Sequence, residues 1–209
     1  MLHVGLTGGI ASGKSTVSNM FQEKGAFLID FDELAHIVEE PGKQAWVAII
    51  NAFGKEILRE NGSIDRAKLG QVVFYDSAKR SRLNRIVHPA VFEEWQCRIE
   101  AIKVEKNNAV IISDVPLLFE VGLNSMFDVS ILVYVPPDVQ IKRLMARNGY
   151  TEEESKARLL SQMSIEEKKK LADIIIENVG SLSETEKRIH QVWKDLLRKE
   201  RNIRQHTGG

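Results

Sequence analysis

The feature that most constrains this chain is a glycine-rich segment near its N-terminus. Gly8 is followed by four residues and then by Gly-Lys-Ser at positions 13–15, between an apolar run over residues 2–6 and a helical pattern over residues 14–24. This is the phosphate-loop pattern in its usual context. Glycines let successive backbone N–H groups surround a phosphate without interference from Cβ atoms, and the helix N-terminus adds a favourable dipole. A chance match would arise in roughly 1% of such chains, so the segment predicts a site for the phosphates of a nucleotide.

Short apolar runs alternate with helical patterns along the rest of the chain. Such runs typify the buried strands of a parallel sheet, whose ligands lie beyond the carboxyl ends of the strands. We therefore predict an α/β fold of the P-loop NTPase class: a five-stranded parallel sheet with helices on both faces, a helical insertion and a helical lid. The expected strands are residues 2–6, 26–29, 109–112, 129–135 and 173–176, and the last helix is expected over residues 183–198.

We expect a single domain over residues 1–209. Its nucleotide-binding core comprises residues 1–30, 107–136 and 171–200, residues 31–106 form a helical acceptor-binding insertion, and residues 137–170 form the lid. Two capping boxes, Thr151 with Glu154 and Ser164 with Glu167, are expected to begin lid helices. Pro89 suits the first turn of a helix in the insertion, and the tail from residue 198 is expected to fray.

Charge and cysteine content exclude several classes of protein. The chain has 29 basic and 29 acidic residues, so no overall basic field favours nucleic acid or a membrane surface as a partner. Cys97 is the one cysteine, which rules out an intramolecular disulfide, and the five histidines lack zinc-ligand spacing. No apolar run is long enough for a signal peptide or a membrane span. We expect a cytoplasmic protein, with the choice between a monomer and a small homo-oligomer left open.

The phosphate loop assigns roles to its own residues. Lys14 is expected to reach the β and γ phosphates of ATP, and the Ser15 hydroxyl to ligate Mg²⁺, which bridges those phosphates as charge develops during transfer. The residues expected to bind ATP here are Gly9, Ile10, Ala11, Ser12, Gly13, Lys14, Ser15 and Thr16.

Carboxylates follow two of the predicted strands. Asp114 closes the apolar run before it, where a group associated with magnesium belongs, although a strand-ending aspartate is also common in ordinary turns. Asp30 and Asp32 follow the second strand, and alternate positions on an extended chain face the same way. One of them is expected to accept the proton of the attacked hydroxyl.

Two pairs in the predicted lid are spaced like neighbours on a helix. Arg143 and Arg147 are four residues apart, as are Arg158 and Gln162, so each pair is expected to share a helical face. Arginines placed this way can clamp the transferring phosphate. The alternative, a solvated helix surface, would be the ordinary explanation in a chain without a phosphate loop.

The sequence resembles the dephospho-CoA kinase family from residue 4 to about residue 193. A generic nucleotide kinase shares only the phosphate loop, whereas this family shares further segments. The matching segments are residues 5–16, 29–32, 64–69, 87–89 and 114–120 (Asp-Val-Pro-Leu-Leu-Phe-Glu), then 143–147, Arg158 with Gln162, 172–173 and 178–180.

The resemblance implies phosphorylation of the 3′-hydroxyl of the dephospho-CoA ribose by ATP, the last step in making coenzyme A. By the same resemblance Asp32 is the catalytic base. From its position at the strand end, Asp114 is expected to serve magnesium, directly or through a water molecule. The implied phosphate clamps are Arg143 and Arg147, Asn178 is implied near the adenine of ATP, and the implied acceptor contacts are Asp32, Arg66, His88, Leu117 and Phe119. From the residues alone, His88 reads as a helix-entry residue and Leu117 and Phe119 as core packing.

Two other functions remain open from the sequence. Another small-molecule kinase of this fold, acting on a nucleoside monophosphate or a metabolite hydroxyl, shares every argument except the acceptor. A P-loop switch that hydrolyses nucleotide slowly is the second, although the chain has no Asn-Lys-x-Asp guanine motif.

Overall fold

The computed structural model describes residues 1–207, and its internal contacts divide the chain into two compact units. The α/β unit comprises Met1–Ile29 and the chain from Ile102 onward, and the helical unit comprises Asp30–Ala101. No helix within residues 1–207 is long and apolar enough to cross a membrane.

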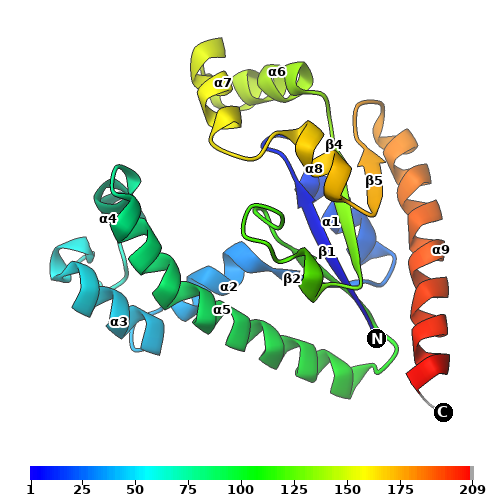
Figure 1. The fold of residues 1–209 in the computed structure, drawn as a ribbon, viewed down its shortest axis with the longest axis horizontal. Coiled ribbons are helices and arrows are strands. Elements are labelled where there is room, and N and C mark those ends of the chain that lie inside the picture. The colour runs from blue at the N-terminus through cyan, green and yellow to red at the C-terminus, as the bar shows by residue number, and fades with distance from the viewer. Residues whose placement is uncertain (208–209) are drawn as a thin grey trace. The chain divides into compact units, whose positions relative to one another are not determined.

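The α/β unit contains the predicted five-stranded sheet, with strand order β2-β3-β1-β4-β5. Strand β1 pairs in parallel with β3 and β4, and β4 pairs in parallel with β5 (Figure 1). The predicted strands are therefore confirmed, with ends that shift by one or two residues. Their bounds are β1 (Leu2–Gly8), β2 (Phe27–Asp30), β3 (Val110–Asp114), β4 (Val129–Tyr134) and β5 (Ile174–Glu177).

Both faces of this sheet are covered, as its apolar strands require. Alternate side chains of a strand point to opposite faces, so Val129, Ile131 and Val133 of β4 join a core with helices α1 (Lys14–Glu23) and α9 (Leu182–Thr207). Figure 1 shows α9 alongside the sheet. Leu132 and Tyr134 instead pack with Ile165 of α8 (Ile165–Leu171).

The segment after β3 packs against the second face of β1. A Cβ atom at Gly5 would lie 2.9 Å from a Phe127 ring carbon and 3.2 Å from a Leu118 methyl carbon, so only glycine allows this approach. A 3₁₀ turn, η2 (Asn124–Met126), precedes Phe127. This packing fixes the course of the chain through residues 115–120, which follow the carboxyl end of β3.

Three helices form the predicted lid region and its return to the sheet. They are α6 (Pro137–Asn148), α7 (Glu152–Leu160) and α8, and both predicted capping boxes are present, at Thr151 and at Ser164. The prediction that Arg158 and Gln162 share a helical face is wrong, because α7 ends at Leu160. The Arg158 guanidinium carbon instead lies 4.1 Å from the centre of the Tyr150 ring.

The helical unit consists of α2 (Phe31–Val38), α3 (Gln44–Phe53), the 3₁₀ turn η1 (Lys55–Ile57), α4 (Arg66–Phe74) and most of α5 (Ser77–Glu105). Phe31 is buried, and its ring centre lies 6.3 Å from that of Phe92 and 5.9 Å from that of Trp95. The insertion is therefore held together by an aromatic cluster between its first and last helices.

Two expectations about helix ends are wrong. Pro89 lies inside α5, which begins at Ser77, so His88 is a mid-helix residue and not an entry residue. Proline removes one N–H from a helix, and the apolar positions Val87, Val91, Trp95 and Ile99 keep the helix packed on both sides of it. Helix α9 extends to Thr207 without fraying at residue 198, because Ile203 still packs against the core. Residues 208–209 of the predicted tail lie outside the described residues.

Candidate active site

The phosphate loop has the backbone conformation that its glycines predict. Gly13, at the N-cap of α1, has φ 85° and ψ 24°, in the left-handed region that favours glycine. A Cβ atom there would collide with the Asn178 side-chain amide. Ala11 has φ 58° and is the one non-glycine residue with positive φ within residues 1–207. Such a conformation costs an alanine about 1–2 kcal/mol, so the surrounding contacts must hold the loop in shape.

Side chains from two helices, α6 and α9, and from Asn178 directly after β5 supply those contacts. The Asn178 amide donates to the Ser12 carbonyl over 2.8 Å, and Gln140 Nε2 donates to the Ile10 carbonyl over 2.7 Å. Arg143 Nη2 donates to the Asn178 carbonyl over 2.7 Å, and Thr185 Oγ1 donates to Asn178 Oδ1 over 2.9 Å. The loop is therefore braced from outside through its carbonyl oxygens, and from within by the N–H groups of Ser12 and Thr16, which donate to the carbonyls of Gly9 and Gly13 over 3.1 Å.

Sequence reasoning missed two of these residues. Gln140 lies three residues before Arg143 on α6, so helical spacing from the predicted clamp could have found it. Thr185 stands near the start of α9 and matches no motif, so the sequence carries no signal for it.

The Lys14 ammonium group forms an ion pair with the Asp114 carboxylate. Lys14 is the first residue of α1, and Asp114 is the last residue of β3, where it is buried beside Leu6 of β1. The structure thus brings together the two residues predicted for the phosphates and for magnesium. Opposite charges in contact attract each other, so the pair holds the Lys14 side chain at the strand end beside the loop.

The residues near the loop offer oxygen donors suited to a hard cation. Ser15 is exposed at the start of α1, and Asp114 contributes a carboxylate. Within residues 1–207 no three His, Cys, Asp or Glu side chains gather closely enough to hold a metal ion by themselves. Magnesium in kinases commonly takes one or two protein oxygens and completes its shell with phosphates and water, and this donor set fits that pattern.

The two arginines of α6 that were predicted as phosphate clamps line one cavity beside the loop. This cavity, of about 430 Å³, is bounded by Ala11, Gly13, Arg143, Ala146 and Arg147. Arg143 is half-buried and hydrogen-bonded as described above, whereas Arg147 is exposed and its Nε donates to Asn148 Oδ1 over 2.8 Å. The shared helical face predicted for this pair is confirmed, and Arg143 is the one fixed to the loop.

A second cavity, of about 380 Å³, adjoins the first residues of the phosphate loop. Its lining is mostly apolar and comes from Gly9 and Ile10, from α6 and α7, and from the turn that leads to α8. Gln162, predicted on a lid helix, lines this cavity from that turn.

The two predicted acceptor contacts after β3 differ in exposure. Leu117 is 42% exposed and can meet a ligand directly, whereas Phe119 is 7% exposed and packs in the interior. From the residues alone, both side chains are expected to pack in the core. The exposed fractions agree with this expectation for Phe119 but not for Leu117.

The remaining predicted site residues lie in the helical unit. Asp30 is the N-cap of α2 and accepts from the Asp32 N–H over 2.8 Å. The extended-chain argument for this pair is therefore wrong, because the chain turns into a helix directly after β2, where a capping carboxylate satisfies free N–H groups. Asp32 is exposed in the first turn of that helix.

Arg66, the first residue of α4, pairs with Glu39 over 2.6 Å beside a cavity of about 120 Å³. Burial raises the pKa of the Glu39 carboxyl above its usual value, although the Arg66 guanidinium acts in the opposite direction. His88 is exposed on α5. The roles of Asp32, Arg66 and His88 stay predictions.

Comparison with known proteins decides the family. A family model described as dephospho-CoA kinase matches residues 2–184. A curated protein of Syntrophus aciditrophicus named dephospho-CoA kinase is 54% identical over 201 residues, which make up 96% of this chain and 86% of that protein. The chain belongs to the dephospho-CoA kinase family. It is accordingly a phosphotransferase that uses ATP, and the alternatives of another metabolite kinase and of a P-loop switch are excluded.

Solved structures agree with membership of the dephospho-CoA kinase family. A dephospho-CoA kinase from Campylobacter jejuni matches with a TM-score of 0.71 at 29% identity, and the match covers 94% of this chain and 97% of that chain. A protein from Thermus thermophilus matches with a TM-score of 0.80 at 33% identity, covering 92% of this chain and 96% of that chain.

Proposed function

We propose that this dephospho-CoA kinase transfers the γ-phosphoryl group of ATP to the 3′-hydroxyl of the dephospho-CoA ribose, with Lys14, Asp32, Arg143 and Arg147 as catalytic residues. The observation that carries the proposal is the Lys14–Asp114 ion pair beside the braced phosphate loop. It sets a cation for phosphate and a carboxylate for a metal at the carboxyl end of adjacent strands, where kinases of this class need them.

ATP binds, in this proposal, at residues 9–16, through backbone N–H groups of the phosphate loop and through the Lys14 ammonium group. Arg143 stands beside the loop with its guanidinium anchored, so it meets the phosphates without first losing side-chain freedom. Arg147 lines the same cavity and is exposed, so it is free to reach the transferring group. Asn178 keeps the adenine contact implied by the resemblance, in addition to its bond to Ser12.

Magnesium, when bound, neutralises charge that develops on the β and γ phosphate oxygens. We propose that Ser15 and Asp114 hold it, directly or through a water molecule. Lys14 would then be drawn from Asp114 toward the phosphates, because they carry the larger negative charge.

The base is assigned to Asp32 in preference to Asp30. The Asp30 carboxylate is engaged in capping α2, whereas Asp32 is exposed two residues further on. A carboxylate beside the attacking hydroxyl orients it and accepts its proton. Arg66, His88, Leu117 and Phe119 are proposed as contacts to dephospho-CoA, with Leu117 the best exposed of those in the α/β unit.

We also propose the division into a nucleotide-binding core, an acceptor-binding insertion over residues 31–106 and a lid over residues 137–170. The helical unit, Asp30–Ala101, and the capping boxes of α7 and α8 support it. The balanced charge supports an enzyme that works without nucleic acid. We propose that it is cytoplasmic and acts as a monomer or a small homo-oligomer.

The direct test incubates the protein with ATP, Mg²⁺ and dephospho-CoA and detects coenzyme A by mass, with phosphorus NMR to locate the new phosphate. Coenzyme A phosphorylated at the 3′ position is expected. Release of free phosphate alone would contradict the proposal.

Two matched variants test the roles of the carboxylates. Asp32→Asn removes the base and should lower single-turnover rates by about 10²- to 10⁴-fold with little change in Mg·ATP affinity. Asp114→Asn should instead weaken Mg·ATP binding, with partial recovery at raised magnesium. An active Asp32→Asn enzyme, or one that has lost only ATP binding, would show that the base is another residue.

A further inference from the structure

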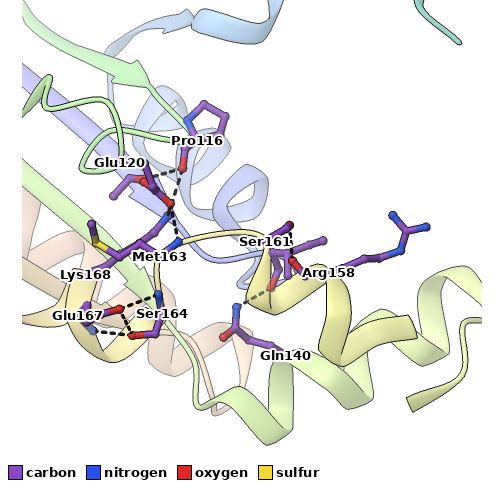
Figure 2. A network of polar contacts seen from close by, with 11 residues as sticks. Pro116, Glu120, Gln140, Arg158, Ser161, Met163, Ser164, Glu167 and Lys168 are labelled. Carbon is purple, nitrogen blue, oxygen red and sulfur yellow. Dashed lines mark hydrogen bonds and ion pairs between the residues drawn. The ribbon is translucent and has the colours of Figure 1, made fainter. Parts of the chain in front are cut away.

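A charged side chain lies fully buried outside the site described above. Lys168 of α8 has 0% exposure, and its Nζ lies 2.7 Å from Glu120 Oε1 and donates to the Pro116 carbonyl over 3.3 Å. Figure 2 shows these three residues converging between α8 and the segment after β3. Burying an ion pair is costly, and a pair of this kind can often be replaced by apolar residues without loss of stability. Its presence therefore points to a role in positioning.

The Glu120 carboxylate depends on this lysine. Its Oε1 atom also accepts from the Met163 N–H over 3.2 Å, in the turn between α7 and α8. Its Oε2 atom is buried and finds no hydrogen-bond partner within residues 1–207. Without Lys168 this largely buried carboxylate would keep the Met163 N–H as a hydrogen-bond donor, so it would be driven to move toward water.

The same cluster reaches the strand that leads into the phosphate loop. The Pro116 carbonyl that accepts from Lys168 also accepts from Thr7 Oγ1 over 3.1 Å. Thr7 is buried in β1, two residues before Gly9. Lys168 therefore joins the end of β1, the segment from Pro116 to Glu120, and the turn that carries Met163.

Each of these three parts borders the proposed reaction. Leu117 and Phe119 lie between the two residues that Lys168 holds, and the turn at Met163 is the point where the lid chain returns to the sheet. The other end of the lid, α6, is tied to the phosphate loop by Gln140 and Arg143. We propose that Lys168 and Glu120 form a positioning pair, which fixes the acceptor-contact segment and the returning end of the lid relative to the phosphate loop. This inference rests on the proposed acceptor role of Leu117 and Phe119.

The test compares Lys168→Met with Lys170→Met and Lys168→Arg. Methionine keeps the length of the side chain but removes its charge, Lys170 is an exposed lysine on the same helix, and arginine restores a cation. Steady-state kcat and KM for dephospho-CoA, the Kd for Mg·ATP and the unfolding midpoint are measured for each. Lys168→Met should lower kcat/KM for dephospho-CoA by about tenfold or more while Mg·ATP affinity changes less than about threefold. Lys170→Met should match the wild type, and Lys168→Arg should recover most of the loss.

Three results would overturn the inference. They are a wild-type kcat/KM for dephospho-CoA in Lys168→Met, an equal loss of affinity for both substrates, or no recovery in Lys168→Arg. If Lys168→Met fails to fold, Glu120→Gln decides, because it keeps an acceptor for Met163 and removes only the charge. The same selective loss is expected for that variant, and wild-type constants would refute the pair. The proposed function is tested separately, by whether the wild-type protein turns over dephospho-CoA at all. The positioning pair is judged on the ratio of the variant's kcat/KM to that of the wild type.

Discussion

Replacement of Asn178 by aspartate tests how the phosphate loop is held. The change keeps the shape of the side chain and the oxygen that accepts from Thr185, but it removes the amide that donates to the Ser12 carbonyl over 2.8 Å. A carboxylate oxygen then faces a carbonyl oxygen in a buried place. We expect a less stable protein with weaker nucleotide binding.

The size of the effect follows from the contacts that are lost. A hydrogen bond contributes about 0.5–1.5 kcal/mol, and a buried group left without its partner costs about 1–3 kcal/mol. The Ser12 carbonyl keeps only the long contact of 3.5 Å from Arg143 Nη1. A total loss of about 2–4 kcal/mol should lower the unfolding midpoint by roughly 4–16 °C for a chain of this length. If about 1.4 kcal/mol of this falls on the loop conformation that binds nucleotide, affinity drops about tenfold.

The assay measures thermal unfolding and the affinities for ATP and for inorganic tripolyphosphate, which has no adenine. Both affinities should fall by the same factor, because the defect lies in the loop that binds phosphates. At low pH the carboxyl group introduced by Asn178→Asp is protonated and can donate to the Ser12 carbonyl, so the loss of stability should shrink. Thr185→Val is the matched control, since it removes the hydroxyl that donates to Asn178 Oδ1 and to the Ser181 carbonyl but keeps the bond from Asn178 to Ser12, and it should cost only about 1 kcal/mol. The bracing role would be refuted if the Asn178→Asp protein had normal stability and normal tripolyphosphate affinity but bound ATP more weakly. Asn178 would then act only as a contact to the adenine.

Three further predictions concern other charged groups. Lys14→Ala should keep the fold, checked by circular dichroism, and lose most turnover, because the phosphates lose their cation; near-normal rates would contradict this. Arg143→Ala should reduce Mg·ATP affinity as well as turnover, because the Arg143 side chain also braces the loop, whereas Arg147→Ala should reduce mainly kcat. An unchanged kcat in both variants would show that neither arginine acts on the transferring phosphate. Although burial opposes it, hydrogen bonds from the Ser130 hydroxyl and N–H hold the pKa of Asp173 below its usual value. The stabilisation that the ionised Asp173 provides should therefore be fully present above the pKa of an aspartate in the unfolded chain, about 3.9, and should disappear as pH falls through the lower pKa of the folded state. Thermal unfolding should show that Asp173→Asn costs about 1–3 kcal/mol near pH 7 and progressively less below pH 4.

The sequence predicted those parts of the fold that depend on local pattern. The central strands β1, β3 and β4 are almost wholly buried, so they read as continuous apolar runs, and the capping boxes at Thr151 and Ser164 are encoded within four residues each. The prediction that a helix begins at Pro89 was wrong. Proline disfavours the interior of an isolated helix, but here buried apolar side chains before and after Pro89 hold one continuous helix together.

The contacts within the site were beyond what a pattern can give. Lys14 was predicted to bind the phosphates and Asp114 to serve the metal. Their ion pair could not be predicted, because it depends on the strand order that sets β3 beside β1. The Asn178–Ser12 bond joins residues 166 positions apart, and no local spacing encodes it. The prediction for Asp30 and Asp32 was wrong because Asp30 is both the last residue of β2 and the N-cap of α2, so Asp32 lies in a helix and the strand period does not extend to it.

The Lys14–Asp114 pair has a consequence for the order in which charges meet. In the free protein the two groups cancel each other. Bare ATP would have to draw Lys14 away and leave the Asp114 carboxylate facing a polyphosphate, with a repulsion that opposes binding. A nucleotide that arrives with its own divalent cation supplies the missing positive charge and makes the exchange neutral. Nucleotide and cation binding are then thermodynamically linked: each should tighten the other by the same factor, and metal-free nucleotide should be a poor competitor even at high concentration.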